Sequence, residues 1–174
     1  MKRINFKAAV VAAMCAFCTA SFAQLGEIGV PEADSASPKA DMRVKRALDN
    51  AGVKYQIDRD GDFAVVWKLD EGRTQLVFIN SRTTKLENME LRTVWTPAFV
   101  VDEVSPNNMR ALLELNTQYK VGAWGLKKQG GKYMAIFSLD VSANSAGSAL
   151  KVFTNVMAIT ADEIEKTVTK ADKY

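Results

Sequence analysis

The sequence predicts an α+β domain in which one antiparallel sheet of five to six strands is packed by three helices. Apolar residues alternate with a period of two over several runs, as is typical of strands. Three other stretches repeat apolar residues at helical spacing. All but one of the links between successive strands are as short as hairpin turns, which favours antiparallel pairing. The expected order is α-β-β-β-(β)-α-β-β-α.

The first helix is expected to begin near residue 37. Ser37 suits the N-cap position and Pro38 the first helical position. Gly52 fits the left-handed conformation just past the end of the helix. The residues at helical spacing between these signals are Val44, Ala47, Leu48 and Ala51.

Residues 62–81 predict a hairpin at the centre of the fold. Its two apolar runs, 63–69 and 74–81, are joined by a turn at 70–72, and a short strand around Tyr55 and Ile57 precedes them. Both faces of each run are largely apolar, which predicts a place in the middle of a covered sheet.

The next strand covers 91–96, and Pro97 is expected either to end it or to place it at a sheet edge. Ser105 and Pro106 repeat the cap-and-proline start of a helix. The side chains assigned to this second helix are Met109, Leu112, Leu113 and Asn116.

A second hairpin and a long helix close the chain. The strands 121–127 and 132–141 are separated by Gly130 and Gly131, which permit a tight reversal. The long helix spans about 145–170 and lays an apolar stripe on the sheet. Its charged run at 162–166 is interpreted as a solvated face with an Asp162–Lys166 pair. The stripe consists of Leu150, Phe153, Met157, Ile164 and Val168.

The first residues have the pattern of a secretory signal peptide. Basic residues precede an apolar run at 8–17, and small residues at Ser21 and Ala23 predict cleavage between Ala23 and Gln24. The alternative of a membrane anchor is disfavoured because the run is shorter than the roughly 20 residues that span a bilayer. We therefore expect a signal peptide at 1–23, a flexible leader at 24–38, a domain at 39–174, and a periplasmic or secreted product without stable membrane insertion.

Composition excludes several classes of chemistry. Residues 1–23 hold three basic residues and no acidic one, so 20 basic residues balance 20 acidic ones after cleavage. A neutral chain has no electrostatic drive toward nucleic acid. The chain has no histidine, and both cysteines leave with the signal peptide, which excludes His- or Cys-dependent catalysis. We expect no catalytic residue, no cofactor and no metal ligand.

Two residue patterns could still point to a site. Asp58, Asp60 and Asp62 surround Gly61 like the start of a calcium loop, but an EF-hand register would put Gln56 at its first position. A hairpin turn is the favoured interpretation. Tryptophans at 67, 95 and 124 could form a stacking platform, although aromatic residues on strands more often fill the core.

Six blocks of sequence together resemble the YbjN-domain family of bacterial sensory transduction regulators. They occur in one order over about residues 40–174, and their combination is specific although no single block is. The blocks are YQIDRDGDF (55–63), GRTQLVF (72–78), ELRTVWTPA (90–98), LELN (113–116) with KVGAW (120–124), GGKY (130–133) and TADEIE (160–165).

The resemblance implies a fold like that of type III secretion chaperones and a non-enzymatic role, with no catalytic residues to transfer. The signal peptide sets this chain apart from cytosolic members, so an intracellular regulatory role is not expected. We expect an exported, chaperone-like protein that holds a protein, peptide or small ligand on its surface in a stress or sensory regulatory role. The candidate surface is the sheet edge near Trp95 and Pro97, with Trp124, or the solvent side of the second helix; the same region can support a homodimer. The alternative is a carboxylate-dependent periplasmic hydrolase with two carboxylates facing one pocket.

Overall fold

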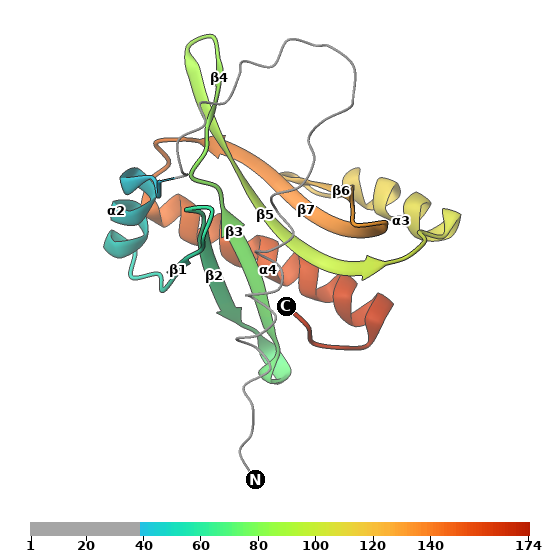
Figure 1. Cartoon of the computed structure of the whole chain (residues 1–174). Coiled ribbons are helices and arrows are strands. Elements are labelled where there is room, and N and C mark those ends of the chain that lie inside the picture. Colours follow the sequence, from blue (N-terminus) through green and yellow to red (C-terminus); the bar gives the residue numbers. More distant parts are fainter. Residues whose placement is uncertain (1–38) are drawn as a thin grey trace.

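A computed structural model describes residues 39–174 as an α+β domain with one antiparallel sheet, as the sequence predicts (Figure 1). The signal peptide, the cleavage site, the leader and the Ser37–Pro38 helix start lie outside these residues. No helix within the described part is long and apolar enough to cross a membrane. In chain order the elements are α2 (Met42–Asn50), β1 (Gln56–Ile57), β2 (Phe63–Lys68), η1 (Asp70–Gly72), β3 (Thr74–Ile79), β4 (Thr84–Leu86), β5 (Met89–Val101), α3 (Pro106–Asn116), β6 (Ala123–Gln129), β7 (Lys132–Ser142) and α4 (Gly147–Thr169).

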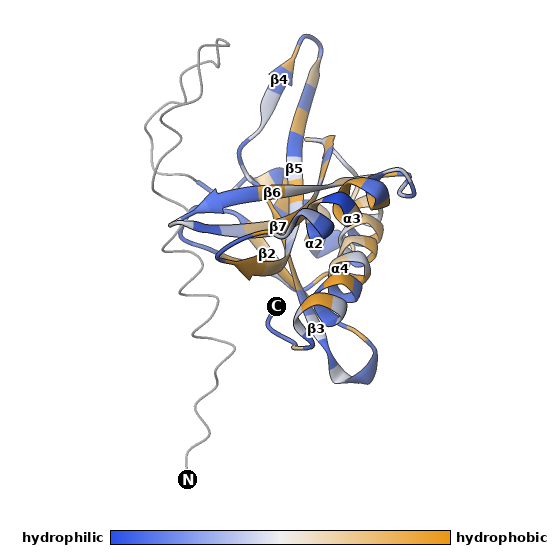
Figure 2. Ribbon diagram, turned by 90° about the vertical axis from the view of Figure 1, so that its right-hand side faces the viewer, coloured by the Kyte–Doolittle hydropathy of each residue, from blue (hydrophilic) through white to orange (hydrophobic). Residues whose placement is uncertain are grey.

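The helices cover one face of the sheet. The strand order is β1-β2-β3-β5-β7-β6, and the short β4, which the sequence did not predict clearly, pairs with the start of β5. Figure 2 shows α3 and α4 on the same side of the strands. The core lies between α4 and the sheet, where Phe63, Phe99, Phe137, Leu150 and Met157 are almost fully buried. Burial of such large apolar side chains is the main stabilising contribution to the domain.

The β2–β3 hairpin forms as expected, but only part of it is central. In β3, every residue from Gln75 onward is buried. In β2, by contrast, only Phe63 and Ala64 have a neighbouring strand on the other side, because they alone pair with β1. Beyond these two residues β2 is an edge strand, and Val66 is 56% exposed. The apolar pattern of β2 therefore predicted a strand in the middle of the sheet, but β1 has only two residues and leaves the rest of β2 at the edge.

Pro97 does not end its strand or place it at an edge, so that expectation was wrong. β5 continues through Pro97 to Val101 and lies between β3 and β7. A bulge follows Pro97, and the Pro97 carbonyl accepts a hydrogen bond of 2.6 Å from Nε2 of Gln75. Proline is tolerated here because the ladder with β3 has already ended, so its missing N–H removes no strand-to-strand bond.

Beyond the short ladder between β3 and β5, the sheet divides into two parts, β1-β2-β3 and β5-β7-β6, which we call its wings. β3 pairs with β5 only through Phe78–Trp95 and Ile79–Val94. Farther along, buried Gln75 and Thr96 bridge the wings with a side-chain hydrogen bond of 2.8 Å. Figure 1 shows the end of the chain in the resulting gap between β3 and the far part of β5.

The starts of α2 and α3 and the end of α2 agree with local sequence signals. At the start of α2, Asp41 is the N-cap, and its side chain accepts a hydrogen bond from the Arg43 N–H, so the helix that contains Val44 and Leu48 begins at Met42. Asp41 suits this position because a carboxylate satisfies free N–H groups in the first turn. The expected cap at Ser105 and left-handed Gly52 are confirmed.

Candidate functional site

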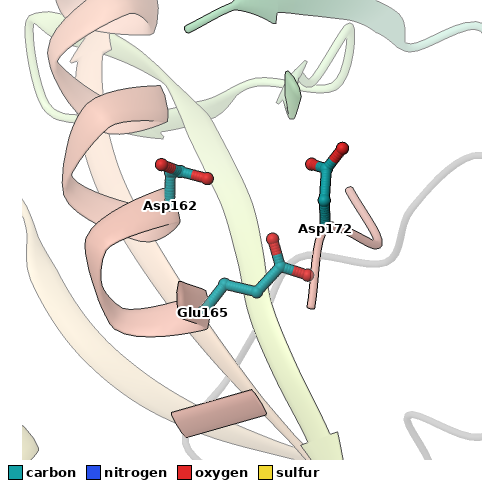
Figure 3. A group of neighbouring side chains, drawn as sticks. All are labelled: Asp162, Glu165 and Asp172. Carbon is teal, nitrogen blue, oxygen red and sulfur yellow. The ribbon is translucent and has the colours of Figure 1, made fainter. Parts of the chain in front are cut away.

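The segment after α4, residues 171–174, passes through the gap between the two wings and brings several polar side chains together. Asp162 and Glu165 reach toward it from the last turns of α4, and Asp172 reaches back from the segment itself (Figure 3). Carboxylate oxygens of these three residues lie within 4.8 Å of one another. We call these residues the acidic cluster.

Arg73 supplies the positive charge of the acidic cluster. Its Nε lies 2.6 Å from Oδ1 of Asp162, and its Nη2 lies 3.3 Å from Oε2 of Glu165. The side chain of Glu165 is fully buried and that of Asp162 is only 13% exposed. The expected solvated charge run on α4 was therefore wrong for these two residues. Their ion-pair partner comes from the turn before β3, which helical spacing along α4 does not indicate.

Burial changes the acidity of Glu165. It raises the pKa of this carboxyl to about 7, and the nearby negative charges of Asp172 and Asp162 act in the same direction. The N–H of Lys173, which donates to Oε1 of Glu165 over 2.8 Å, and the charge of Arg73 oppose this rise. Glu165 is consequently a desolvated carboxyl that titrates near neutral pH.

The acidic cluster is built for internal contacts. Glu165 accepts from the Lys173 N–H, and Asp172 accepts from the Thr74 N–H over 3.1 Å. Three close carboxylates have the oxygen chemistry that Ca²⁺ or Mg²⁺ prefers. Here, however, the Arg73 guanidinium lies against two of them, so a divalent cation would have to displace it. The geometry fits a network of ion pairs and hydrogen bonds that holds segment 171–174 in place better than it fits a metal site.

These contacts place Tyr174 on the face of the sheet that the helices do not cover. Thr74 Oγ1 donates to the Tyr174 carbonyl over 3.2 Å. Tyr174 packs against a second apolar cluster made of Ala64, Leu76 and Phe78 together with Trp95. Burial, followed by the charge of Glu165, raises the pKa of the Tyr174 hydroxyl to about 12. The tyrosine is therefore neutral at physiological pH.

Trp95 is the centre of this second cluster. Its ring stacks on Phe78 with centroids 4.5 Å apart, and Nζ of Lys127 lies 5.8 Å from the ring centroid. Its indole N–H donates to Asn80 over 3.0 Å. The side chain of Trp95 is half-buried. We call Leu76, Phe78, Trp95 and Lys127, on which Tyr174 lies, the open-face aromatic surface.

The other predicted surface residues lie elsewhere. Trp124 is buried in the main core, and Trp67 packs against that core from the side of the helices. The three tryptophans therefore form no common platform, and the favoured core interpretation is right for Trp124. Pro97 is buried within β5. Of Trp95, Pro97 and Trp124, the structure leaves only Trp95 accessible, and its role toward a partner stays a prediction.

The aspartate-rich stretch forms the expected turn. Asp58 Oδ1 accepts from the N–H groups of Asp60 and Asp62, each over 2.9 Å, and Gly61 has a φ of 79°. Asp62 in turn accepts from the Ser81 N–H over 2.7 Å. These bonds bring together the two ends of the β2–β3 hairpin.

A second charged network lies at the opposite end of the sheet and was not predicted. Buried Arg92 donates to Asp41 over 2.7 Å, and Arg43 joins Asp41 to Glu90. These ion pairs hold the start of α2 against β5. They adjoin an open cleft of about 580 Å³, whose lining residues are Lys85, Glu87, Asn88, Met89, Glu90, Leu91, Ser142 and Asn144.

Comparison with known proteins identifies one family over most of the chain. A family model named YbjN, with the description "Putative bacterial sensory transduction regulator", matches residues 41–170. The match begins at the N-cap of α2 and ends just after α4, so it includes every strand and helix described above. Asp172 and Tyr174 lie beyond it. A search of curated proteins finds no match.

Proposed function

Since the chain belongs to the YbjN family, whose description is that of a sensory transduction regulator, we propose that it acts by binding rather than by catalysis. It holds an extended peptide segment of a partner protein on the open-face aromatic surface. In this role it resembles a chaperone, which presents a surface to another chain without chemical turnover.

One observation carries this proposal: the surface already holds a short peptide with an aromatic side chain. Segment 171–174 lies against β3 through hydrogen bonds from Thr74, and its tyrosine packs among Leu76, Phe78 and Trp95. A partner segment of similar chemistry that displaced segment 171–174 would find the same partners: the N–H and the hydroxyl of Thr74 at the start of β3, and an apolar site for a ring. Lys127 adds a positive charge at its margin.

We further propose that binding takes place outside the cytoplasm. The basic start of the chain, the short apolar run and the small residues before Gln24 support export. An exported member of this family would report on, or protect, proteins of the periplasm or the medium. Mass spectrometry of the exported form is expected to give Gln24 as the first residue, and an intact Met1 in the membrane fraction would contradict export.

The binding role is testable by photo-crosslinking in intact cells. Val66 is exposed and lies on the open face, since it pairs with Leu76 of the aromatic cluster. A photo-reactive phenylalanine analogue at position 66 is expected to capture a second protein, and Trp95→Ala is expected to reduce the yield. The matched control places the analogue at Met109, which is exposed on α3. Equal capture at both positions, or none at position 66, would contradict the proposal.

A carboxylate-dependent hydrolase is the second candidate, and the acidic cluster is the observation that favours it. Glu165 is desolvated and has other carboxylates nearby, as general-acid catalysis requires. Against it, Arg73 and main-chain N–H groups occupy the carboxylate oxygens. Hydrolysis of glycoside or ester substrates that disappears in Glu165→Gln, with folding intact, would favour this candidate over the binding role.

A further inference from the structure

The outward face of α4 carries an exposed stripe of β-branched residues. Val152, Val156 and Ile159 are 59%, 44% and 45% exposed, while Leu150 and Met157 on the other side of the helix are buried in the core. β-branched residues are poor helix formers, so the helix itself gains nothing from them at solvent positions. The stripe is an apolar surface that the described part of the chain leaves uncovered.

The spacing of this stripe is that of a helix-pairing seam. Steps of four and then three residues separate Val152, Val156 and Ile159, which are the alternating a and d positions of a heptad. Extending the same steps gives half-buried Ala149 before the stripe and exposed Glu163 after it. The seam therefore has a small residue at one end and a negative charge at the other.

We propose that α4 pairs in antiparallel orientation with α4 of a second copy of this chain. A parallel pair would place Glu163 against the same residue of the other copy, and like charges at one seam position repel. In an antiparallel pair, a two-fold axis midway between Val152 and Ile159 sets the partner's Glu163 beside residue 148. That residue lies in the first turn of α4.

The start of α4 is suited to receive a carboxylate. Its N-cap residue, Ala146, makes no side-chain hydrogen bond to the first turn. The free N–H groups of a first turn carry partial positive charge and attract an anion. The partner's Glu163 thus supplies at each end of the pair the negative group that the sequence of α4 does not provide. Two identical stripes that end in complementary groups select a second copy as the occupant.

The area of the stripe determines how tightly the two copies are expected to associate. A stable dimer buries roughly 800 Å² on each partner, more than three partly exposed aliphatic side chains contribute. We therefore expect a reversible dimer that dissociates on dilution. Because the stripe lies on the helix side of the sheet, opposite Trp95, this inference does not depend on the proposed peptide-binding role.

Sedimentation equilibrium of the purified chain over a wide concentration range tests the pairing. The average mass is expected to rise from that of a monomer toward twice that value, and Val156→Glu is expected to remain monomeric at every concentration. The matched control is Leu113→Glu, which changes an apolar side chain that is 67% exposed on α3 and should leave association unchanged. Circular dichroism verifies that both variants are folded.

A second variant tests the orientation. Glu163→Lys places a positive charge against the partner's first turn and is expected to weaken the dimer, whereas in a parallel pair it would merely exchange one repulsion for another. A wild-type chain that remains monomeric at millimolar concentration would overturn the proposal. So would association that survives Val156→Glu, or a dimer unaffected by Glu163→Lys.

Discussion

Arg73 connects three parts of the molecule that are far apart in sequence. It precedes β3, contacts Asp162 and Glu165 on α4, and so lies beneath the segment that carries Tyr174. A guanidinium suits this place because its planar donors can serve two carboxylates at once. The side chain is largely buried, and its loss would leave carboxylates without a counter-charge.

We expect Arg73→Met to destabilise the domain by about 3–5 kcal/mol, because removing one partner of a buried ion pair leaves the other uncompensated. Urea unfolding measures the change. Arg110→Met is the control, since the Arg110–Glu114 pair is exposed on α3 and such pairs contribute about 0.5 kcal/mol or less. Similar losses in the two variants would show that Arg73 is not a buried counter-charge.

The raised pKa of Glu165 makes stability depend on pH. The folded state holds the Glu165 proton up to a pKa of about 7, whereas the ordinary value is 4.5. Folding is therefore favoured while the carboxyl is protonated, and this contribution is lost as pH rises from about 4.5 to 7. Buried Asp62, whose pKa is raised to about 6, acts in the same direction.

We expect Glu165→Gln to flatten the fall in unfolding free energy between pH 5 and pH 8, because glutamine stays neutral throughout. Chemical denaturation at several pH values measures the slope. Glu114→Gln on the exposed face of α3 should keep the wild-type slope. An unchanged slope in Glu165→Gln would mean that this carboxyl is already ionised at pH 5 in the folded protein.

At the scale of elements, α2 and α4 approach each other closely. A Cβ added to Gly147 would lie 1.9 Å from the carbonyl oxygen of Ala47, which is main chain and cannot rotate away. Glycine at the first residue of α4 is thus a condition of this contact. The absence of a side chain at Gly147 allows the two helices to come this close.

Gly147→Ala should therefore destabilise the domain by about 1–3 kcal/mol through overpacking, although alanine is usually the better helix former. Thermal unfolding is the measurement. Gly125→Ala is the comparison, because its added Cβ would meet only a side-chain carbon of Ile136 at 3.9 Å. Gly147→Ala as stable as the wild type would mean that α2 can shift freely on α4.

The elements that the sequence predicted well are those set by local chemistry. The Asp-Gly and Gly-Gly turns and the Ser105–Pro106 helix start depend on residues within one turn of each other. Pro97 was misjudged because its tolerance comes from Gln75 and the divergence of β3. The charge run of α4 was misjudged because Arg73 lies 89 residues from Asp162, and no local spacing reveals such a contact. The open-face aromatic surface likewise needs β3, β5 and segment 171–174 together.

At the scale of the molecule, segment 171–174 joins the two faces of the sheet. It is fixed to α4 by Glu165 on the helix side and covers Leu76 and Phe78 on the other side. One short stretch therefore contributes both to stability and to the exposure of the proposed binding surface.

Removal of residues 171–174 is expected to lower the free energy of unfolding by about 1–3 kcal/mol, since Glu165 loses a hydrogen bond and the aromatic cluster loses the Tyr174 ring. The same variant should bind more of the fluorescent dye ANS, which reports exposed apolar surface. Lys173→Ala keeps the main-chain N–H that Glu165 uses and should change neither quantity. Unchanged dye binding in the truncated chain would indicate that the segment covers no apolar surface.

The position of α4 also determines when this chain can fold. Among the described elements the helix comes last in the chain, yet it packs against α2, β2, β3, β5 and β7. Until it has been synthesised, the core face of the sheet lacks the cover that α4 provides, and the contacts between α2 and α4 cannot form. Native contacts of such long sequence separation form slowly. The core of the described domain can therefore be completed only after α4 has been synthesised.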